Sequence, residues 1–477
     1  MRFDNLIDGQ WVAGSTTVPN INPSDIQDVI GQFAQACIEN VDEAVVAAKL
    51  GQKRWMDLGI QERSIILDRI GTTILARIDA LGSLLAREEG KIIAEAKGEV
   101  ARAGHIFKFY AGELLRQSGE IIDSIRPGIE VMITRQPVGI VGLITPWNFP
   151  IAIPAWKIAP ALAFGNAVIF KPAELAPASA HALVSIIVEC GVPAGAIALL
   201  MGSGKIIGQA MVDHSGIHAI SFTGSVKTGR SVTMSAVTRS ARVQTEMGGK
   251  NPLVILDDAQ LDLAVECAAN GAFYSTGQRC TASSRIIVTE GIYDRFVEAL
   301  ARKVNSLKVG PALDHLTQIG PVVDEVQLAK NLGYIERAQQ DGGILFAGGS
   351  RVKCETDGWY LQPALITETS NEMAINREEV FGPVASVIRV KNFETALAAA
   401  NDSEFGLSSG IVTQSLKHAT EFRRRAEAGM VMVNAPTAGV DYHVPFGGTK
   451  ASSFGPREQG SYAKEFYSTL KTSYVAT

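Results

Sequence analysis

The sequence predicts an α/β protein with two parallel-sheet halves, a helical region ahead of them and a small antiparallel ribbon. Three observations predict this: short apolar strands alternate with helix-like stretches, apolar residues recur every three or four positions over 66–85, and two segments alternate strand formers with polar residues. Apolar strands separated by helices are typical of parallel sheets covered on both faces. Since 477 residues exceed one compact core, we expect two or three domains.

The expected elements follow in order along the chain. A helix is predicted over 66–85, because one face carries Ile and Leu at helical spacing, and Gly71 is a weak point in it rather than an end. A second helix is expected over 179–189. Residues 120–136 and 466–475 are expected to form the antiparallel ribbon, which is suited to an interface between subunits. The buried strands are predicted at 140–144, 167–170, 196–200, 251–256, 285–288 and 430–433.

Composition and charge exclude several classes of protein. Hydrophobic residues make up 46% of the chain and charged residues 19%, which is typical of a globular protein rather than a disordered one. A net charge of -5 argues against a nucleic-acid partner. No apolar run is long enough for a bilayer, and residues 1–5 lack the features of a secretory signal. Five cysteines without CxxC pairing favour a reducing cytoplasm over disulfides or zinc, so we expect no metal.

A cysteine in a polar turn is the first candidate for chemistry. The segment Gly277-Gln278-Arg279-Cys280-Thr281 suits a turn that presents a thiol to a cleft. Arg279 and a nearby helix end favour the thiolate, which is the nucleophilic form of cysteine. A lone cysteine in a loop is nevertheless more often structural. Taken alone, this segment leaves both interpretations open.

Two other polar side chains stand at expected strand ends. Glu246 lies just before Gly248 and Gly249, and a carboxylate on such a turn can act as a general base if burial raises its pKa. Asn148 follows the strand over 140–144, where ligands of open α/β sheets collect, and its amide can donate to an oxyanion. The alternatives are a solvated or ion-paired glutamate and an asparagine that only caps a turn.

Two further segments indicate a nucleotide. Lys171 and Glu174 follow the strand over 167–170, where both side chains can contact a ribose hydroxyl. Residues 222–229 lead from a strand into a helix through glycines, a geometry that can hold a phosphate on backbone N–H groups. The second signal is weak, because the segment is neither GxGxxG nor a P-loop.

Taken together, the ordered motifs resemble the aldehyde dehydrogenase superfamily over essentially the whole chain. The resemblance implies a Rossmann-like NAD(P)-binding domain, an α/β catalytic domain and a β-ribbon for oligomerisation. It places these domains at 1–119 with 137–247, at 248–447, and at 120–136 with 461–477, respectively. The matching segments are 146–150, 171–174, 222–225, 246–250, 277–280, 379–383 and 445–448.

The resemblance also implies roles for single residues. Cys280 is the nucleophile that attacks the aldehyde carbon, Asn148 and the Cys280 backbone hold the oxyanion, and Glu246 activates the water that hydrolyses the thioester. Lys171 is placed with this catalytic set and, together with Glu174, at the adenosine ribose. The cofactor residues implied are Ile144, Thr145, Pro146, Trp147, Lys171, Ala173, Glu174, Gly204, Phe222, Thr223, Gly224, Ser225 (pyrophosphate), Met247, Gly248, Glu379 (nicotinamide ribose) and Phe381.

The nature of the cofactor and of the acyl acceptor follows from two carboxylates. Glu174 would repel a 2′-phosphate, which favours NAD over NADP. Glu246 favours hydrolysis over transfer to coenzyme A, since acylating relatives usually lack this carboxylate. The assembly implied is a homodimer or homotetramer, because the ribbon would otherwise leave open sheet edges.

Within the superfamily the chain is most similar to bacterial 2,5-dioxovalerate (α-ketoglutarate semialdehyde) dehydrogenases, through residues 153–157, 275–281, 434–440 and 457–460. This similarity implies oxidation of 2,5-dioxovalerate to 2-oxoglutarate. The alternatives are a succinate semialdehyde or broad aliphatic aldehyde dehydrogenase, a cysteine hydrolase, and a catalytically inactive relative with a structural or binding role. The candidate substrate residues are Phe149, Trp156, Arg279, Thr281 and His443.

Overall fold

Five parallel strands form the centre of the first large sheet. In the computed structural model, which describes residues 2–116 and 119–476, this sheet has the strand order β22-β12-β11-β8-β9-β10-β2-β3. The order reverses at β8, which pairs with both β9 and β11. The parallel strands are β8 (Ile140–Ile144), β9 (Ala167–Lys171), β10 (Ile197–Leu199), β11 (Ala219–Thr223) and β12 (Arg242–Glu246); β2 (Asn5–Ile7), β3 (Gln10–Val12) and β22 (Ser453–Phe454) are antiparallel additions.

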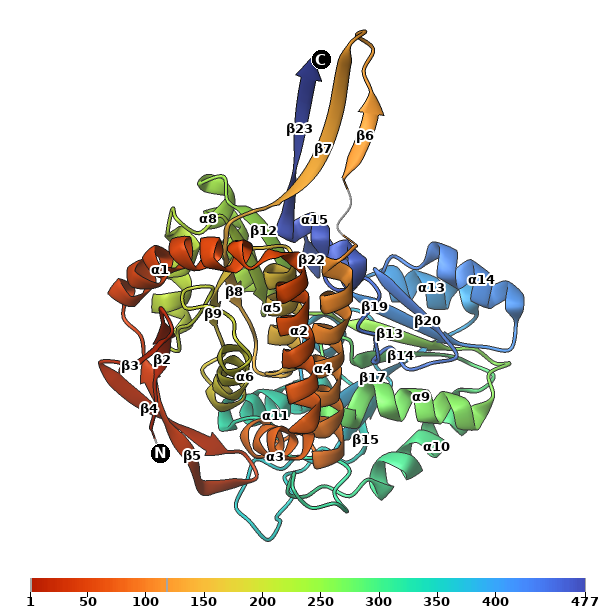
Figure 1. Ribbon diagram of the computed structural model, residues 1–477. Coiled ribbons are helices and arrows are strands. Elements are labelled where there is room, and N and C mark those ends of the chain that lie inside the picture. Colours follow the sequence, from red (N-terminus) through yellow and green to blue (C-terminus); the bar gives the residue numbers. More distant parts are fainter. Residues whose placement is uncertain (1, 117–118, 477) are drawn as a thin grey trace.

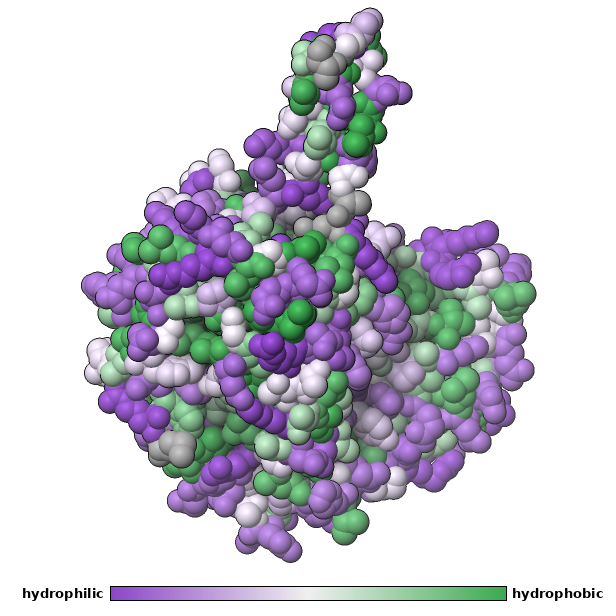
Figure 2. All heavy atoms as spheres, in the orientation of Figure 1, coloured by the Kyte–Doolittle hydropathy of each residue, from purple (hydrophilic) through white to green (hydrophobic). Residues whose placement is uncertain are grey.

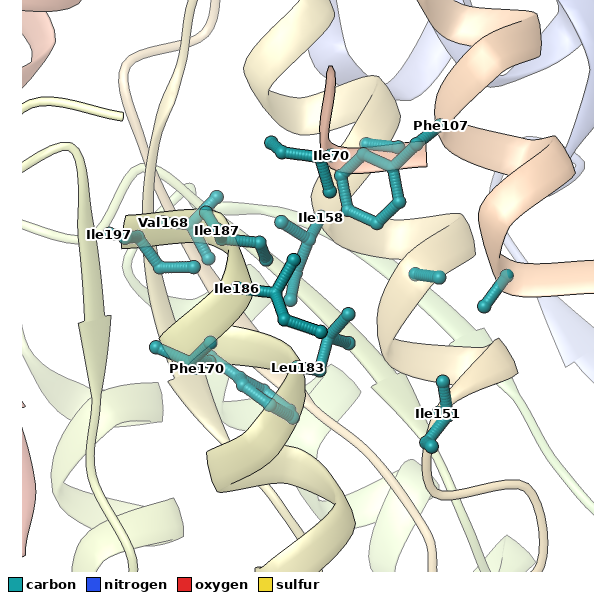
Figure 3. Close-up of a cluster of buried hydrophobic side chains, with 14 of the residues drawn as sticks. Ile70, Phe107, Ile151, Ile158, Val168, Phe170, Leu183, Ile186, Ile187 and Ile197 are labelled. Atoms are coloured by element: carbon teal, nitrogen blue, oxygen red, sulfur yellow. The ribbon is translucent and has the colours of Figure 1, made fainter. Parts of the chain in front are cut away.

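Alternation along the strands supplies apolar side chains to both faces of this sheet. In β9, Val168 and Phe170 pack into one hydrophobic cluster, whereas Ala167 and Ile169 pack into another. Figure 3 shows Val168 and Phe170 against α6 (Pro177–Glu189), which begins with a proline in its first turn. The helices of the first face are α2 (Gly59–Ala76), α4 (Ile93–Leu114), α5 (Ala152–Ala163) and α6. Those of the second face are α1 (Ile38–Asp57), α7 (Gln209–Asp213) and α8 (Val226–Thr238).

The single helix predicted over 66–85 is wrong. The chain forms α2 (Gly59–Ala76) and α3 (Ile78–Glu89), interrupted at Arg77, whose φ of -109° and ψ of 20° end α2. Both helices pack on α4 (Ile93–Leu114), so the regularly spaced apolar residues belong to two consecutive helices rather than to one. The helix does continue through Gly71, as predicted: a Cβ there would lie 2.6 Å from the Gly104 carbonyl oxygen, so α2 and α4 approach closely at this point.

The second large sheet has the order β15-β16-β17-β14-β13-β19-β20 and is parallel except for β15. One face is covered by α9 (Leu261–Phe273) and α10 (Tyr293–Ser306), and the other by α13 (Phe393–Asn401) and α14 (Leu416–Arg425), while α11 (Glu325–Gln340) and α12 (Ala374–Arg377) pack near β16. The strands are β13 (Asn251–Ile255), β14 (Ser283–Thr289), β15 (Ile344–Ala347), β16 (Ala364–Thr367), β17 (Val384–Val390), β19 (Ser408–Val412) and β20 (Met430–Val433). All six predicted strands are therefore present, and the α/β fold class is confirmed. Five of the strands are buried as predicted, whereas β20 is only half-buried because it lies at the edge of its sheet.

A three-stranded antiparallel ribbon projects from the body, at the top of Figure 1. It consists of β6 (Glu120–Asp123), β7 (Ile129–Pro137) and β23 (Ser468–Ala476). The C-terminal part of the predicted ribbon begins later than expected, because 460–467 form a 3-10 turn (Gly460–Ala463) and α15 (Lys464–Tyr467). Phe466 and Tyr467 are buried there in the first core, so they cannot belong to an exposed strand.

The N-terminal region contains strands that the sequence did not predict. β1 (Arg2–Phe3), β4 (Thr16–Asn22) and β5 (Asp25–Gln35) form a separate three-stranded sheet. A two-stranded pair, β18 (Phe405–Gly406) with β21 (Thr449–Lys450), lies in the C-terminal part of the chain. Across 2–116 and 119–476, none of the helices combines the length and apolar character needed to span a bilayer.

Candidate active site

The predicted cofactor residues lie along one edge of the first sheet. Neighbouring strands run in the order β12-β11-β8-β9, and all four are parallel, so their carboxyl ends meet at the same edge. Glu246 ends β12, Thr223 ends β11, Ile144 ends β8 and Lys171 ends β9. The reversal of strand order between β11 and β8 creates the crevice in which open α/β sheets bind ligands.

A pocket of about 180 Å³ opens at this edge. Trp147 and Phe381 form part of its wall, with ring centroids 5.4 Å apart and ring planes at 88°. The pocket brings together predicted residues from both halves of the chain: Pro146, Trp147, Asn148, Thr223, Gly224, Ser225, Met247, Gly248, Cys280, Glu379 and Phe381. Ile153, Gln327 and Lys330 also line it and were not predicted.

The two sheets meet at this pocket because β12 runs into β13 through residues 247–250. The carboxyl edge of the first sheet therefore faces the amino edge of the second, where Cys280 precedes β14. Gly248 lies at the junction, and a Cβ on it would come within 2.3 Å of the Glu379 carboxylate. Glu379 accepts a hydrogen bond of 2.9 Å from the Gly249 N–H, and burial raises the pKa of Glu379.

The Cys280 turn is fixed by contacts from three parts of the chain. Ser275, Thr276 and Gly277 before it all have positive φ, and a Cβ on Gly277 would lie 2.2 Å from the Gly382 carbonyl oxygen. The Ser275 N–H donates to Glu95 of α4 at 3.0 Å. Asn251 of β13 donates to the Cys280 carbonyl at 2.7 Å. These contacts hold the thiol in one place against the pocket.

The expectation that the surroundings of Cys280 favour the thiolate is wrong for the protein without ligands. Burial raises the pKa of Cys280 to about 12, and the negative charges of Glu379 and Glu246 add to this effect. The backbone N–H groups of Cys280 and Thr281 lower the pKa by a smaller amount. Arg279 does not offset the burial, because its guanidinium turns away from the thiol and donates to the Asn270 carbonyl in α9.

Asn148 lies beside Cys280 in the pocket and is buried. Its side-chain Nδ2 donates to the Gln278 carbonyl at 3.0 Å, which leaves the second amide hydrogen for a ligand. The backbone carbonyl of Asn148 accepts a hydrogen bond of 2.7 Å from Lys91 Nζ, and Lys91 also pairs with Glu99 at 2.7 Å. The buried ion pair between Lys91, which precedes α4, and Glu99 of α4 thus holds Asn148 in position.

Glu246 is buried at the end of β12 and belongs to a network that the sequence did not predict. Its carboxylate accepts a hydrogen bond from Ser453 Oγ of β22. Burial raises the pKa of Glu246 well above its ordinary value, and the negative charge of Glu458 adds to the effect. Glu458 itself is bound by Lys157 Nζ and by Trp156 Nε1, the latter at 2.6 Å. A proton therefore resides on Glu246 more readily than on an exposed glutamate.

A second cluster of predicted residues lies beyond β9. Lys171 is buried and its Nζ donates to the Pro172 carbonyl at 2.8 Å. Burial lowers the pKa of Lys171 to about 8, and the charge of Glu174 opposes this shift. Glu174 is exposed and accepts the Gly204 N–H at 2.8 Å. Lys171, Glu174 and Gly204 are thus adjacent, whereas Ile144, Thr145 and Phe222 are buried behind the edge.

The predicted substrate residues are spread over several environments. Phe149 lies under Lys91 Nζ, which is 3.8 Å from its ring centroid, and Trp156 is buried with its ring 5.5 Å from Phe446. Thr281 follows Cys280 and is buried, and its carbonyl accepts a hydrogen bond from Thr437. His443 is exposed beside Tyr442. Arg279 points toward α9 and is therefore the weakest of these candidates.

One of the missed residues carried a readable signal. Lys157 is the one charged residue in α5, whose other side chains are apolar, and a lone charge in a buried helix indicates an ion pair. Ser453, Gln327 and Lys330 had none, because only the tertiary fold brings them to the pocket.

The fold and the site define an α/β protein with a half-buried cysteine, a buried asparagine and a buried glutamate at a nucleotide-type sheet edge. The sequence profile described as the aldehyde dehydrogenase family matches residues 11–473. The chain is 41% identical over 475 residues to the alpha-ketoglutaric semialdehyde dehydrogenase of Bacillus subtilis (strain 168), covering 99% of this chain and 97% of the relative. It is also 41% identical to the alpha-ketoglutarate semialdehyde dehydrogenase of Haloferax volcanii, covering 98% of each.

A solved structure of similar shape is betaine aldehyde dehydrogenase from Staphylococcus aureus in complex with NAD+. Its TM-score is 0.96 at 33% identity, over 99% of this chain and 95% of that one. The chain therefore belongs to the aldehyde dehydrogenase family and is an NAD(P)-dependent oxidoreductase.

Proposed function

We propose that the protein oxidises 2,5-dioxovalerate to 2-oxoglutarate through a thioester on Cys280. The observation that carries the chemistry is that Cys280 and Asn148 line one pocket at the junction of the two sheets, with Glu246 next to the pocket residue Met247 and close enough for its charge to raise the pKa of Cys280. The substrate is supported by two relatives, each 41% identical over nearly the whole chain, whose names specify alpha-ketoglutarate semialdehyde oxidation.

The residues of the site divide the chemistry among them. The Cys280 sulfur attacks the aldehyde carbon, and the new oxyanion accepts hydrogen bonds from the free Asn148 amide hydrogen and the Cys280 N–H. When bound, NAD(P)+ supplies the hydride acceptor. Loss of the hydride turns the carbon already bonded to the Cys280 sulfur into a thioester. A water then attacks that carbon while Glu246 takes a proton from the water, and the C–S bond breaks to release the carboxylate product and the Cys280 thiolate.

The proton on Glu246 has to leave before each hydrolysis. Because burial and the charge of Glu458 raise the pKa of Glu246, its proton is bound tightly in the free protein. Ser453 stabilises the charged carboxylate by donating to it, and the Lys157 ammonium has the same effect at longer range. These two groups keep the base form of Glu246 accessible inside a water-poor site.

The residues present fit a dinucleotide. Gly248 leaves the space into which Glu379 projects from the amino edge of the second sheet, and Glu174 stands beyond β9 at the carboxyl edge of the first sheet. The N-terminus of α8, capped by Ser225, follows β11 at the same edge of the first sheet, and its helical N–H groups suit a pyrophosphate. Lys171 beside Glu174 completes the donor set for an adenosine ribose.

We propose NAD as the preferred cofactor, since the exposed carboxylate of Glu174 would repel a 2′-phosphate. Glu174→Gln keeps an acceptor for the Gly204 N–H but removes the charge. We expect this variant to raise the ratio of kcat/KM for NADP to that for NAD by about tenfold. An unchanged ratio would remove Glu174 from cofactor selection.

The first test of the function is NADH formation with a panel of aldehydes. The panel contains 2,5-dioxovalerate, succinate semialdehyde and propionaldehyde, each with NAD and with NADP. We expect 2,5-dioxovalerate to lead in kcat/KM by tenfold or more, which is about 1.4 kcal/mol of transition-state preference. A lead for succinate semialdehyde would assign that substrate instead, and a flat profile would indicate a broad aliphatic enzyme.

The assembly proposed is a homodimer or homotetramer formed through the ribbon. The ribbon exposes apolar side chains, including Ile121 at 74% and Leu470 at 59% on its strands and Ile125 at 100% in the turn between β6 and β7. Figure 2 shows green, apolar residues along this projection, which has little core of its own to bury them. A reducing compartment such as the cytoplasm suits the five cysteines, all of which are free thiols.

A further inference from the structure

Helix α4 presents one row of charged residues to the active site. Glu95, Glu99 and Arg102 are spaced at i, i+4 and i+7, so they lie on the same face of the helix. Glu95 binds the Ser275 N–H of the nucleophile turn, and Glu99 binds the N–H groups of Ile151 and Ala152 at the start of α5. The carboxylates of both acids therefore already accept hydrogen bonds from backbone N–H groups.

Arg102, the third member of the row, does not have a complete set of partners. Its Nη2 donates to Gln459 Oε1 at 3.1 Å, and its guanidinium stacks on the Trp156 ring, 5.5 Å from the centroid. Its Nε is buried and has no hydrogen-bond partner among the residues that the structure describes. An unpaired N–H of a buried cation costs free energy in the absence of an acceptor.

The side chain of Gln459 also has a buried N–H donor without an acceptor among the described residues. The side chain is fully buried, its Oε1 is occupied by Arg102, and its Nε2 lacks an acceptor within the described parts of the chain. The segment is fixed, because Tyr110 of α4 donates to the neighbouring Gly460 carbonyl at 2.9 Å. Two rigidly held groups, one cationic and one neutral, thus offer N–H donors with nothing to receive them.

The location of this pair relates it to the reacting thiol. Trp156, on which the Arg102 guanidinium stacks, lies one turn of α5 after Ile153, which lines the Cys280 pocket. Burial lowers the pKa of Arg102, and negative charge at Glu99, Cys280 and Asp441 would oppose that shift. Glu99 is matched by Lys91 at 2.7 Å, and Asp441 is exposed. The positive charge of Arg102 is therefore left for an anion bound near the nucleophile.

We propose that Arg102, supported by Gln459, binds the carboxylate of the aldehyde substrate and so selects aldehydes that carry a carboxylate at their far end. The carboxylate accepts from Arg102 Nε and Gln459 Nε2, while the rest of the chain lies along Trp156 toward Cys280. The inference rests on the proposed function, since it assigns a residue to the recognition of that substrate.

The test compares 2,5-dioxovalerate with pentanal, which has the same chain length but no carboxylate, in the full-length protein. Arg102→Met should lower the ratio of kcat/KM for 2,5-dioxovalerate to that for pentanal by about a hundredfold, the size expected for a charge-assisted hydrogen bond. The loss should lie mainly in KM, because the carboxylate is held before and during the reaction. Arg102→Lys, which keeps the charge but not the guanidinium fork, should lose less.

Lys108→Met is the matched control on the same helix, because Lys108 binds Asp68 and Thr72 on the side of α2. It should leave the ratio unchanged. A wild-type ratio near one would overturn the proposed substrate itself. A high wild-type ratio that both Arg102 variants retain would overturn the role of Arg102 and leave the substrate standing.

Discussion

At the scale of single residues, the site pairs a thiol and a carboxyl that both hold their protons. Burial raises the pKa of Cys280 to about 12 and raises that of Glu246 well above its ordinary value. A pocket dry enough to protect a thioester also disfavours the charged forms on which its chemistry depends.

Alkylation reports the state of the thiol. Because the pKa of Cys280 lies near 12, its thiolate fraction rises with pH throughout the neutral and alkaline range. We expect the rate of modification by iodoacetamide, measured by mass spectrometry without cofactor, to rise about tenfold per pH unit between pH 7 and 10. The Cys280→Ala variant identifies the contribution of the other thiols. A rate that levels off near pH 7 would show a thiolate already formed.

Removal of the thiol separates chemistry from binding. Cys280→Ala should lose all measurable dehydrogenase activity and still bind NAD, since the cofactor contacts proposed above lie on other side chains. NADH formation and tryptophan-fluorescence titration measure the two properties. Full turnover by the variant would rule out the covalent mechanism.

Replacement of the base should separate the two halves of the reaction. Glu246→Gln is expected to give a burst of NADH of about one equivalent per site, followed by a steady rate lowered by about a hundredfold or more. In the unmodified protein the raised pKa of Glu246 makes the base form more abundant as pH rises, so hydrolysis should accelerate toward alkaline pH. A normal steady rate in the variant would remove Glu246 as the base.

At the scale of elements, the close contact of α2 with α4 supports the site, since α4 carries Glu95, Glu99 and Arg102. Gly71→Ala would place a Cβ 2.6 Å from the Gly104 carbonyl oxygen, and overpacking of this kind costs about 1–3 kcal/mol. Gly98→Ala on α4 is the matched control, because its Cβ would meet nothing within 4 Å. Thermal unfolding should show a lower midpoint for the first variant and an equal or higher one for the second. Equal midpoints would show that the contact relaxes freely.

The sequence predicted those elements whose signal is local. Strands such as β8 and β9 were predicted because the chain forms short apolar runs there. The polar residues after them were predicted to lie at the sheet edge because they directly follow the ends of those strands. The break at Arg77 was missed because the apolar spacing continues across it. Strands β1 to β5 were missed because they are short or consist largely of partly exposed residues, which leaves little apolar pattern.

The same limit applies to the site. Cys280, Asn148 and Glu246 stand in segments with their own sequence motifs. Arg102 and Ser453 lie far from those motifs in sequence, and only packing brings Arg102 to Trp156 and Ser453 to Glu246. A motif therefore predicts the groups that react, whereas the groups that tune and select require the folded chain.

At the scale of the whole molecule, the ribbon projects from the body (Figure 1), and the rest of the chain leaves many of its apolar side chains uncovered. A double variant, Ile121→Glu with Leu470→Glu, places charges on exposed apolar positions of β6 and β23, the two outer strands of the ribbon. We expect light scattering to show a smaller molar mass than for the unmodified protein. Leu416→Glu on α14 is the control, since Leu416 is 82% exposed and lies outside the ribbon. An unchanged mass in the double variant would place the interface elsewhere.

The return of the chain to the first sheet has a consequence for biosynthesis. β22 closes the edge beside β12 and supplies Ser453 to Glu246, and Phe466 and Tyr467 fill the core of the first sheet. A nascent chain therefore carries Cys280 long before the partners of Glu246 have left the ribosome. Glu246 and its partner Ser453 therefore come together only after residue 453 has been made, so a product interrupted before it presents Cys280 without the completed network around Glu246.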